Sequence, residues 1–168
     1  MTSGKRTSLI IAAAVIGAAL AIWKLIPSDE GQIRSVLDDV EDIVSISGVE
    51  APLEAVVQAR KLEPLFAGNA RIDLQTPTLG KESMLGRSEI VQTAAGIRSR
   101  VSDVQVEFSD VTVTVSPEGK TAHVQLTAKA EYGPDDDLWM QKVQIEFVNG
   151  DDGWQIARAK GVNPPLVK

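Results

Sequence analysis

The chain offers few residues for metal or nucleophilic chemistry. His123 is its only histidine and it has no cysteine, so it cannot assemble a typical zinc site or a Cys–His nucleophile. His123 alternates with apolar residues and shares its phase with Thr121, Gln125 and Thr127, which predicts that it points away from the core of a sheet. We interpret His123 as a surface or interface residue, with a catalytic role as the alternative.

Acidic residues are the other candidates for chemistry. Asp73 lies between Ile72 and Leu74, whose phase looks more buried, so Asp73 is either a base in a pocket or a solvated strand residue. The stretches 134–139 (PDDDLW) and 149–154 (NGDDGW) lack the alternating ligand spacing of a calcium loop. Asp and Gly are ordinary turn residues. The sequence therefore predicts no metal site, and it gives no sign of a cofactor.

Hydrophobic periodicity predicts two helices ahead of the first strand. Ser28 is a suitable N-cap, the apolar residues that follow it form one stripe of an amphipathic helix, and Gly48 ends that helix. The second helix begins at Pro52, a favoured first-turn residue. Its expected inner face consists of Leu53, Val56 and Val57.

A strand, a loop and a third helix should follow. Residues 70–76 (ARIDLQT) predict a short strand, and the Gly- and Pro-containing stretch 76–86 (TPTLGKESMLG) predicts a loop. Ser88 is the expected cap of the third helix.

The rest of the domain predicts antiparallel strands. The apolar phase is even from Val104 to Phe108 and odd from Val111 to Val115, so a β-bulge at Ser109–Asp110 should bend a long strand. Residues 162–168 form a C-terminal tail whose prolines exclude it from a central strand position. The predicted fold class is α+β, with three helices packed on a strongly bent antiparallel sheet.

This order of elements resembles the nuclear-transport-factor-2-like superfamily, which includes ketosteroid isomerases and polyketide-cyclase-like (SnoaL-like) proteins. The resemblance covers about residues 31–161, and the stretches that carry it are 65–77 (LFAGNARIDLQTP), 85–97 (LGRSEIVQTAAGI) and 143–161 (VQIEFVNGDDGWQIARAKG). It implies a cystatin-like cone of curved sheet and helices, whose open end holds a small molecule in some members.

The sequence departs from the isomerase pattern. The position of the carboxylate base falls on Leu74 or Thr76, depending on the alignment, and neither can take up a proton as a carboxylate does. The first helix has no Tyr, and the only acid of strand 121–132 is Glu131, which lies on the outward phase. We therefore predict no catalytic residue, and an isomerase- or cyclase-like enzyme with atypical residues is the least favoured alternative.

The sequence and the resemblance also suggest candidate binding sites. Near the open end of the cone, the ligand-pocket candidates are Asp73, Arg87 and Trp139. Arg87 belongs to a group of cations that would either receive an anion or form a solvated helix face, and Trp139 is a rim residue or part of an exposed contact patch. On the outer sheet face, the candidates for a homodimer interface are Thr112, His123, Thr127 and Gln144.

Residues 9–26 predict a membrane anchor. Leu9 to Trp23 contain no polar side chain, and a helix over 9–26 would span about 27 Å, enough for the core of a bilayer. The basic segment 1–8 favours a cytoplasmic N-terminus, which puts the domain, residues 28–161, outside the cytoplasmic membrane of a bacterial envelope. The alternative is a signal peptide cleaved after Ala19-Leu20-Ala21, which would release a secreted form.

Charge and architecture narrow the function. Of the 17 Lys and Arg residues, 14 follow residue 28 (17 minus Lys5, Arg6 and Lys24), against 23 acids, so the exported part carries 14 − 23 = −9. This charge argues against binding nucleic acid. The architecture also resembles exported domains of single-span scaffold proteins in type IV secretion systems. We predict a membrane-anchored, non-enzymatic binding or assembly module with a homodimeric or envelope-protein partner; the alternative is a small-molecule binder that uses the cone.

Overall fold

The computed structural model describes residues 28–76, 80–133, 137–162 and 166–167 of the chain. The predicted anchor over 9–26 and its basic flank lie outside these residues. Within the described part, no helix is both long and apolar enough to cross a membrane.

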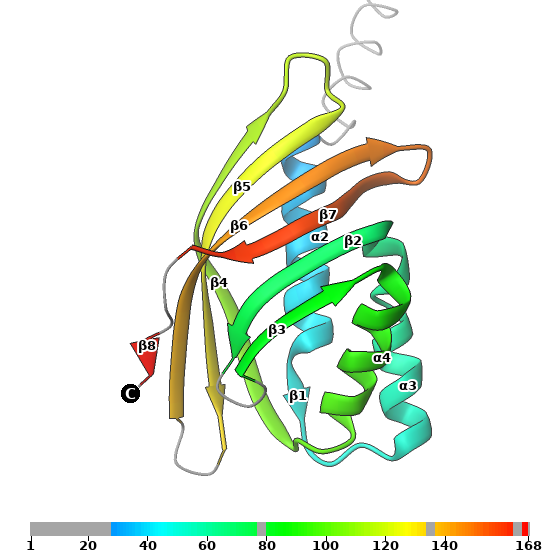
Figure 1. Ribbon diagram of the computed structural model, residues 1–168, viewed down its shortest axis with the longest axis vertical. Coiled ribbons are helices and arrows are strands. Elements are labelled where there is room, and N and C mark those ends of the chain that lie inside the picture. The colour runs from blue at the N-terminus through cyan, green and yellow to red at the C-terminus, as the bar shows by residue number, and fades with distance from the viewer. Residues whose placement is uncertain (1–27, 77–79, 134–136, 163–165, 168) are drawn as a thin grey trace, which may run out of the picture.

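Three helices and a curled sheet make up the described domain. The helices are α2 (Asp29–Val44), α3 (Pro52–Arg60) and α4 (Arg87–Arg98), with a 3-10 turn at Glu63–Leu65. The strands are β1 (Ile46–Ser47), β2 (Phe66–Thr76), β3 (Gly80–Leu85), β4 (Asp103–Val115), β5 (Thr121–Tyr132), β6 (Asp137–Gly150), β7 (Gly153–Gly161) and β8 (Leu166–Val167). Figure 1 shows the sheet curling around the side on which all three helices lie. The predicted fold class is thus confirmed in its main features.

The sheet is mixed, whereas the sequence predicted an antiparallel one. Its order is β1-β4-β5-β6-β7-β2-β3, with β8 paired to β6. The strands β4 to β7 form an antiparallel meander, but β2 runs parallel to β7. The difference arises because β2 precedes the meander in the chain and joins its far side, next to the last long strand.

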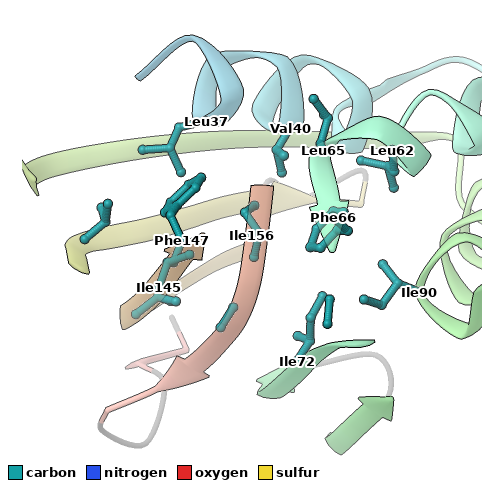
Figure 2. Packing of buried hydrophobic residues seen from close by; sticks show 14 of the residues in the cluster. Leu37, Val40, Leu62, Leu65, Phe66, Ile72, Ile90, Ile145, Phe147 and Ile156 are labelled. Carbon is teal, nitrogen blue, oxygen red and sulfur yellow. The ribbon is translucent and has the colours of Figure 1, made fainter. Parts of the chain in front are cut away.

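Helix α2 is fixed at its start by side-chain hydrogen bonds. The Ser28 hydroxyl accepts from the backbone N–H of Gly31 at 3.1 Å, as the predicted N-cap should. The indole N–H of Trp154 donates to the Asp29 carboxylate at 3.1 Å and ties the first turn to β7. The inner stripe buries Ile33, Leu37 and Val40 against the sheet; Figure 2 shows Leu37 and Val40 above Phe147 and Ile156.

Helix α2 also covers the open edge of β4. Beyond its short pairing with β1, β4 would expose unpaired backbone groups. The Glu41 carboxylate accepts from the N–H of Phe108 at 2.6 Å, and the Ser45 hydroxyl accepts from the N–H of Val106 at 3.1 Å. These side chains take the place of a neighbouring strand and protect an edge that could otherwise pair with another chain.

Helix α3 packs through small residues, which corrects the prediction from sequence. Its buried residues are Ala55 and Ala59, while the side of α3 expected to be inside is exposed: 77% for Leu53 and 55% for Val57. Small side chains allow α3 to lie close to α4, and this closeness, not apolarity alone, determines which side of α3 faces inward.

Two further expectations near α4 were wrong. Residues 80–85 form the edge strand β3, which pairs with β2, and not a loop. Helix α4 begins at Arg87, and its N-cap is Gly86 with φ 89°, so Ser88 is inside the helix and does not cap it. A positive φ at the cap favours glycine over the expected serine.

The predicted β-bulge in β4 is confirmed. The pairing of β4 with β5 shifts register between Ser109 and Thr112, and Asp110 has φ 54°, in the left-handed region. A bulge bends its strand and increases its twist. The lower halves of β4 and β5 therefore turn away from the upper halves, as Figure 1 shows.

One hydrophobic core holds the domain together. Every buried member of the core cluster lies between Ile33 and Ala159, and α2 has its own N-cap at Ser28. Residues 28–168 thus carry the complete described core, and we expect them to fold without the first 27 residues.

Candidate ligand cavity

A cavity of about 540 Å³ lies between the concave face of the sheet and the helices. On the sheet side, inward-facing residues of β4, β5 and β6 line it, including Phe108, Ala128 and Ala130. On the other side, α4 contributes residues from successive turns, including Thr93 and Ile97. Its volume is within the range of sites that enclose small molecules.

Small side chains create this space. Along β5 the inward residues Val124 and Leu126 are followed by the smaller Ala128 and Ala130. Ala94 lines the cavity from α4. The bulge at Asp110 lies in β4 next to this change and bends the strand there. The cavity thus combines a bent sheet with alanines at positions where the core would otherwise have large residues.

The cavity has a deep end and a mouth. Figure 2 shows Phe66, Ile72 and Ile90 pointing toward one another, and all three line its inner part. At the other end, Tyr132 is the last residue of β5 and pairs with Val104 near the start of β4. Both of these residues line the cavity and are half-buried, and the next lining residue, Gly133, is exposed. The mouth therefore lies where β5 ends and β4 begins.

The lining is aliphatic and aromatic with few polar groups. Among the described residues no Asp or Glu lines it, and the polar side chains of the lining are Thr93, Arg98, Tyr132 and the indole of Trp139. Neither Thr93 nor Tyr132 has a hydrogen-bond partner for its hydroxyl among the described residues. Within the same part of the chain, no group of three or more acidic or histidine side chains could hold a metal ion.

Arg98 is buried and fully engaged. Its side chain is 8% exposed and that of its partner Glu50 is 12% exposed. The guanidinium donates through Nε to Glu50 Oε2 at 2.9 Å and through Nη2 to Glu50 Oε1. Its Nη1 donates to the backbone carbonyls of Ile43 and Ser45 at the end of α2. Arg98 is therefore a clamp between α4, the end of α2 and the loop before α3.

Trp139, a predicted pocket residue, lines the cavity and is buried. Its indole N–H donates to the carbonyl of Gln75 at 3.1 Å. The ladder between β6 and β7 ends at the pair Val143–Gly161, so Trp139 lies where β7 no longer separates β6 from β2. The indole bridges these two strands and closes the wall of the cavity at that point.

Asp73, the second predicted pocket residue, does not line the cavity. Its carboxylate accepts from Arg71 Nε at 2.7 Å and from the Ser83 hydroxyl at 2.7 Å, with Arg158 Nη2 at 3.8 Å. The hydrogen bond from Arg71, followed by that from Ser83, lowers the pKa of Asp73 to about 2. Asp73 stands between Ile72 and Leu74, which do line the cavity, and alternation along β2 turns it outward.

Arg87, the third predicted pocket residue, also lies outside the cavity lining. Its Nη1 donates to the carbonyl of Glu63 at 3.2 Å, so it links the first turn of α4 to the 3-10 turn. Of the two nearby arginines at the end of α4, Arg98 is engaged with Glu50 and Arg100 is exposed to solvent.

The four interface candidates differ in exposure. Thr112 and His123 are exposed and Gln144 is half-buried, as an outer sheet face allows. Thr127 is buried, which departs from the prediction, and its hydroxyl donates to the Asp110 carboxylate at 3.2 Å. The bulge places Asp110 across Thr127, and this covering could not be read from strand alternation.

The residues that define the cavity most directly were not among the predicted site residues. Ala128 and Ala130 follow each other on the inward phase of β5, and that loss of side-chain volume was the available signal. Tyr132 continues the same phase. The ion pair between Arg98 and Glu50 could not be predicted from the sequence, because the two residues are far apart in it.

Comparisons with known proteins define the fold. No protein-family model matches the chain, and no curated protein matches it. Among solved structures, the Kfla4162 protein from Kribbella flavida has 17% identity and a TM-score of 0.64 over 83% of this chain and 93% of its own. An NTF2-like protein with a cystatin-like fold from Novosphingobium aromaticivorans has 16% identity and a TM-score of 0.60 over 87% and 86%.

A third similar structure is a proposed scytalone dehydratase from N. aromaticivorans, with 16% identity and a TM-score of 0.58 over 81% of this chain and 83% of its own. At such identities the likeness extends to the fold alone. The domain thus has the nuclear-transport-factor-2-like, cystatin-like fold, as the sequence resemblance implied. That fold hosts unrelated functions, so the function must be argued from the cavity.

Proposed function

We propose that this protein is a membrane-anchored, non-enzymatic binder of a small apolar molecule, and that the cone cavity is its binding site. The observation that carries the proposal is a cavity of about 540 Å³ whose lining is almost entirely apolar. Water gains little from contact with such walls, and an apolar molecule that replaces it removes the walls from water.

The polar side chains that line the cavity support a role in binding without catalysis. General acid–base chemistry near neutral pH needs a group that titrates there, such as His or a carboxyl group with a raised pKa. Among the described residues the lining has neither, and its polar side chains are the hydroxyls of Thr93 and Tyr132, the engaged Arg98 and the indole of Trp139. Similar folds include a proposed aromatic ring hydroxylase and a proposed scytalone dehydratase, but the described lining contains no His, Asp or Glu that could serve as a general base.

The anchor over 9–26 is part of the proposal, with the N-terminus inside and the domain outside the cytoplasmic membrane. Figure 1 shows the start of α2 and the end of β5 at opposite ends of the domain. An anchor joined to α2 at Ser28 would hold the mouth of the cavity away from the bilayer. The ligand would then load from the aqueous side.

Binding of an uncharged fluorescent dye tests the proposal. Residues 28–168 are titrated with Nile red, and we expect saturable binding to one site. Ala130→Phe fills the cavity from β5 and should abolish this binding, whereas Thr114→Phe adds the same side chain to an exposed position on β4 and should not. Absence of binding to the unmodified domain, or equal binding to both variants, would refute the proposal.

A protein-interaction module is the second candidate function. It is favoured by a patch of exposed apolar side chains on and before α3, formed by Val49, Leu53, Val56 and Val57. Patches of this kind mark interaction sites when they are contiguous. The outer sheet face, with Thr112, His123 and Gln144, is a separate proposal for a homodimer interface. Light scattering of residues 28–168 tests the dimer, which charge reversal at Gln144 should dissociate.

A further inference from the structure

We infer that the ligand of the cavity is an uncharged amphiphile, with a hydrocarbon body in the interior and one neutral hydrogen-bonding group held by the hydroxyls of Thr93 and Tyr132. The inference rests on the proposed function and adds the chemical class of the ligand. It follows from the depth at which each lining residue lies and from the groups that the lining lacks.

The inner part of the cavity favours the hydrocarbon portion of a ligand. Its inner part is formed by Phe66, Ile72 and Ile90, and the adjoining strand positions add Leu126 and Ile145. None of these side chains can donate or accept a hydrogen bond. A polar group placed there would lose its bonds to water without replacement, which is costly. The part of the ligand that reaches the inner end is therefore apolar.

Among the described residues, a charged head group finds no free partner in the cavity. A cationic group would need a carboxylate, and no described Asp or Glu lines the cavity. An anionic group would need Arg98, the one cation of the described lining, but its charge is balanced by Glu50. Four of its donor contacts are made within the protein, two to Glu50 and two to carbonyls at the end of α2. A carboxylate ligand would have to displace Glu50 and leave it buried without its partner.

The two hydroxyls define where a neutral polar group can bind. Tyr132 ends β5 at the mouth, and Thr93 lies midway along the α4 face that runs from Ile90 to Ile97. Both are half-buried, and among the described residues neither hydroxyl has a hydrogen-bond partner. A hydroxyl can donate and accept, so an alcohol, ketone, ester or amide group satisfies it without a charge.

A series of ligands with one chain and different head groups tests the inference. Residues 28–168 are loaded with Nile red, which is displaced by 1-decanol, decanoate or decylammonium at pH 7.4. We expect 1-decanol to bind at least about tenfold more tightly than either ion, because each ion must enter an apolar site without a partner. Decanoate should gain affinity as the pH falls toward the carboxyl pKa, whereas the affinity of decanol should stay constant.

Variants without a hydroxyl test the role of Thr93 and Tyr132. Tyr132→Phe and Thr93→Val should each weaken decanol binding by about 2- to 12-fold, the range of one net hydrogen bond, and leave Nile red binding within about twofold. Thr114→Val makes the same substitution outside the cavity and should change neither.

The outcomes separate the two proposals. If Nile red does not bind, the proposed function fails. If it binds and all three head groups displace it equally, or if decanoate is preferred and Arg98→Met removes the preference, the inference fails while the cavity stands as a binding site. Unchanged decanol affinity in both hydroxyl variants would likewise overturn the assignment of the polar group.

Discussion

Breaking the Arg98–Glu50 clamp should destabilise the domain more than any surface substitution. Both side chains are nearly buried, and Arg98 also holds the carbonyls of Ile43 and Ser45 at the end of α2. Glu50→Gln keeps the shape of the side chain but leaves the guanidinium charge buried without its counter-ion. The removal of one partner from a buried pair costs about 3–5 kcal/mol. A domain of this size has about 5–15 kcal/mol of stability in total, so the loss should be large.

Urea unfolding of residues 28–168 measures the effect, and a double-mutant cycle isolates the pair. We expect Glu50→Gln and Arg98→Met each to lower the free energy of unfolding by about 3–5 kcal/mol, or the melting temperature by about 12–20 °C. The double variant should cost much less than the sum, because no unpaired charge is left, with a coupling energy of at least about 1.5 kcal/mol. Arg100→Met, at an exposed position near the end of the same helix, is the matched control and should change stability by less than about 0.5 kcal/mol.

Additive effects in that cycle, or single variants that lower the free energy of unfolding by less than about 1 kcal/mol, would contradict this prediction. Either result would mean that the Arg98 guanidinium reaches water and does not depend on Glu50. The exclusion of anionic ligands from the cavity would then lose its basis as well.

Other parts of the fold give further predictions. Leu53→Ser should change the free energy of unfolding by less than about 0.5 kcal/mol, because Leu53 is 77% exposed. Ile33→Ala in the core should lower it by about 2–5 kcal/mol. Equal losses for the two variants in urea unfolding would mean that Leu53 is buried on the inner face of α3. Glu41→Ala should cost about 1.5–3 kcal/mol and promote concentration-dependent aggregation seen by light scattering, because it removes the acceptor for the N–H of Phe108 on an open strand edge. The Asp73 carboxyl should titrate near pH 2 when followed by NMR. Because folding lowers its pKa, its contribution to stability should be complete above the unfolded pKa near 3.8 and lost as the pH falls toward 2. A titration midpoint near 3.8 would contradict the contacts with Arg71 and Ser83.

Local patterns predicted much of the fold correctly. The phase change at Ser109–Asp110 indicated the bulge, because alternation with period two leaves no other way to move an apolar face from even to odd positions. Ser28 indicated the start of α2 through the chemistry of its cap. In both cases the signal and the structure lie within a few residues of each other.

The errors arose where tertiary packing decides the outcome. The strand β3 reads as a loop because an edge strand needs little apolar alternation, and its pairing with β2 is what makes it a strand. The inner face of α3 depends on how closely α4 approaches it, so Ala59 is inside and Leu53 outside. Thr127 is buried only because the bulge brings Asp110 over it.

The candidate site could be predicted only in part. Of the three pocket candidates, Trp139 lines the cavity. Asp73 and Arg87 were predicted from their charge and their place near the loop, but their side chains hydrogen-bond to Arg71 and Glu63 outside the cavity. The cavity itself is a space between elements distant in the sequence. Its clearest trace in the sequence is the pair of alanines at 128 and 130 on the inward side of β5.

The most direct test of the central claim is native mass spectrometry of residues 28–168, purified gently from the natural host. If the cavity binds an uncharged, mainly apolar ligand, we expect a bound molecule on the order of a few hundred daltons that can be extracted into organic solvent. The same preparation of Ala130→Phe should be free of it, and that of Thr114→Phe should retain it. A domain that carries no such molecule in any preparation, or an adduct that Ala130→Phe retains unchanged, would contradict the claim that the cavity is the binding site.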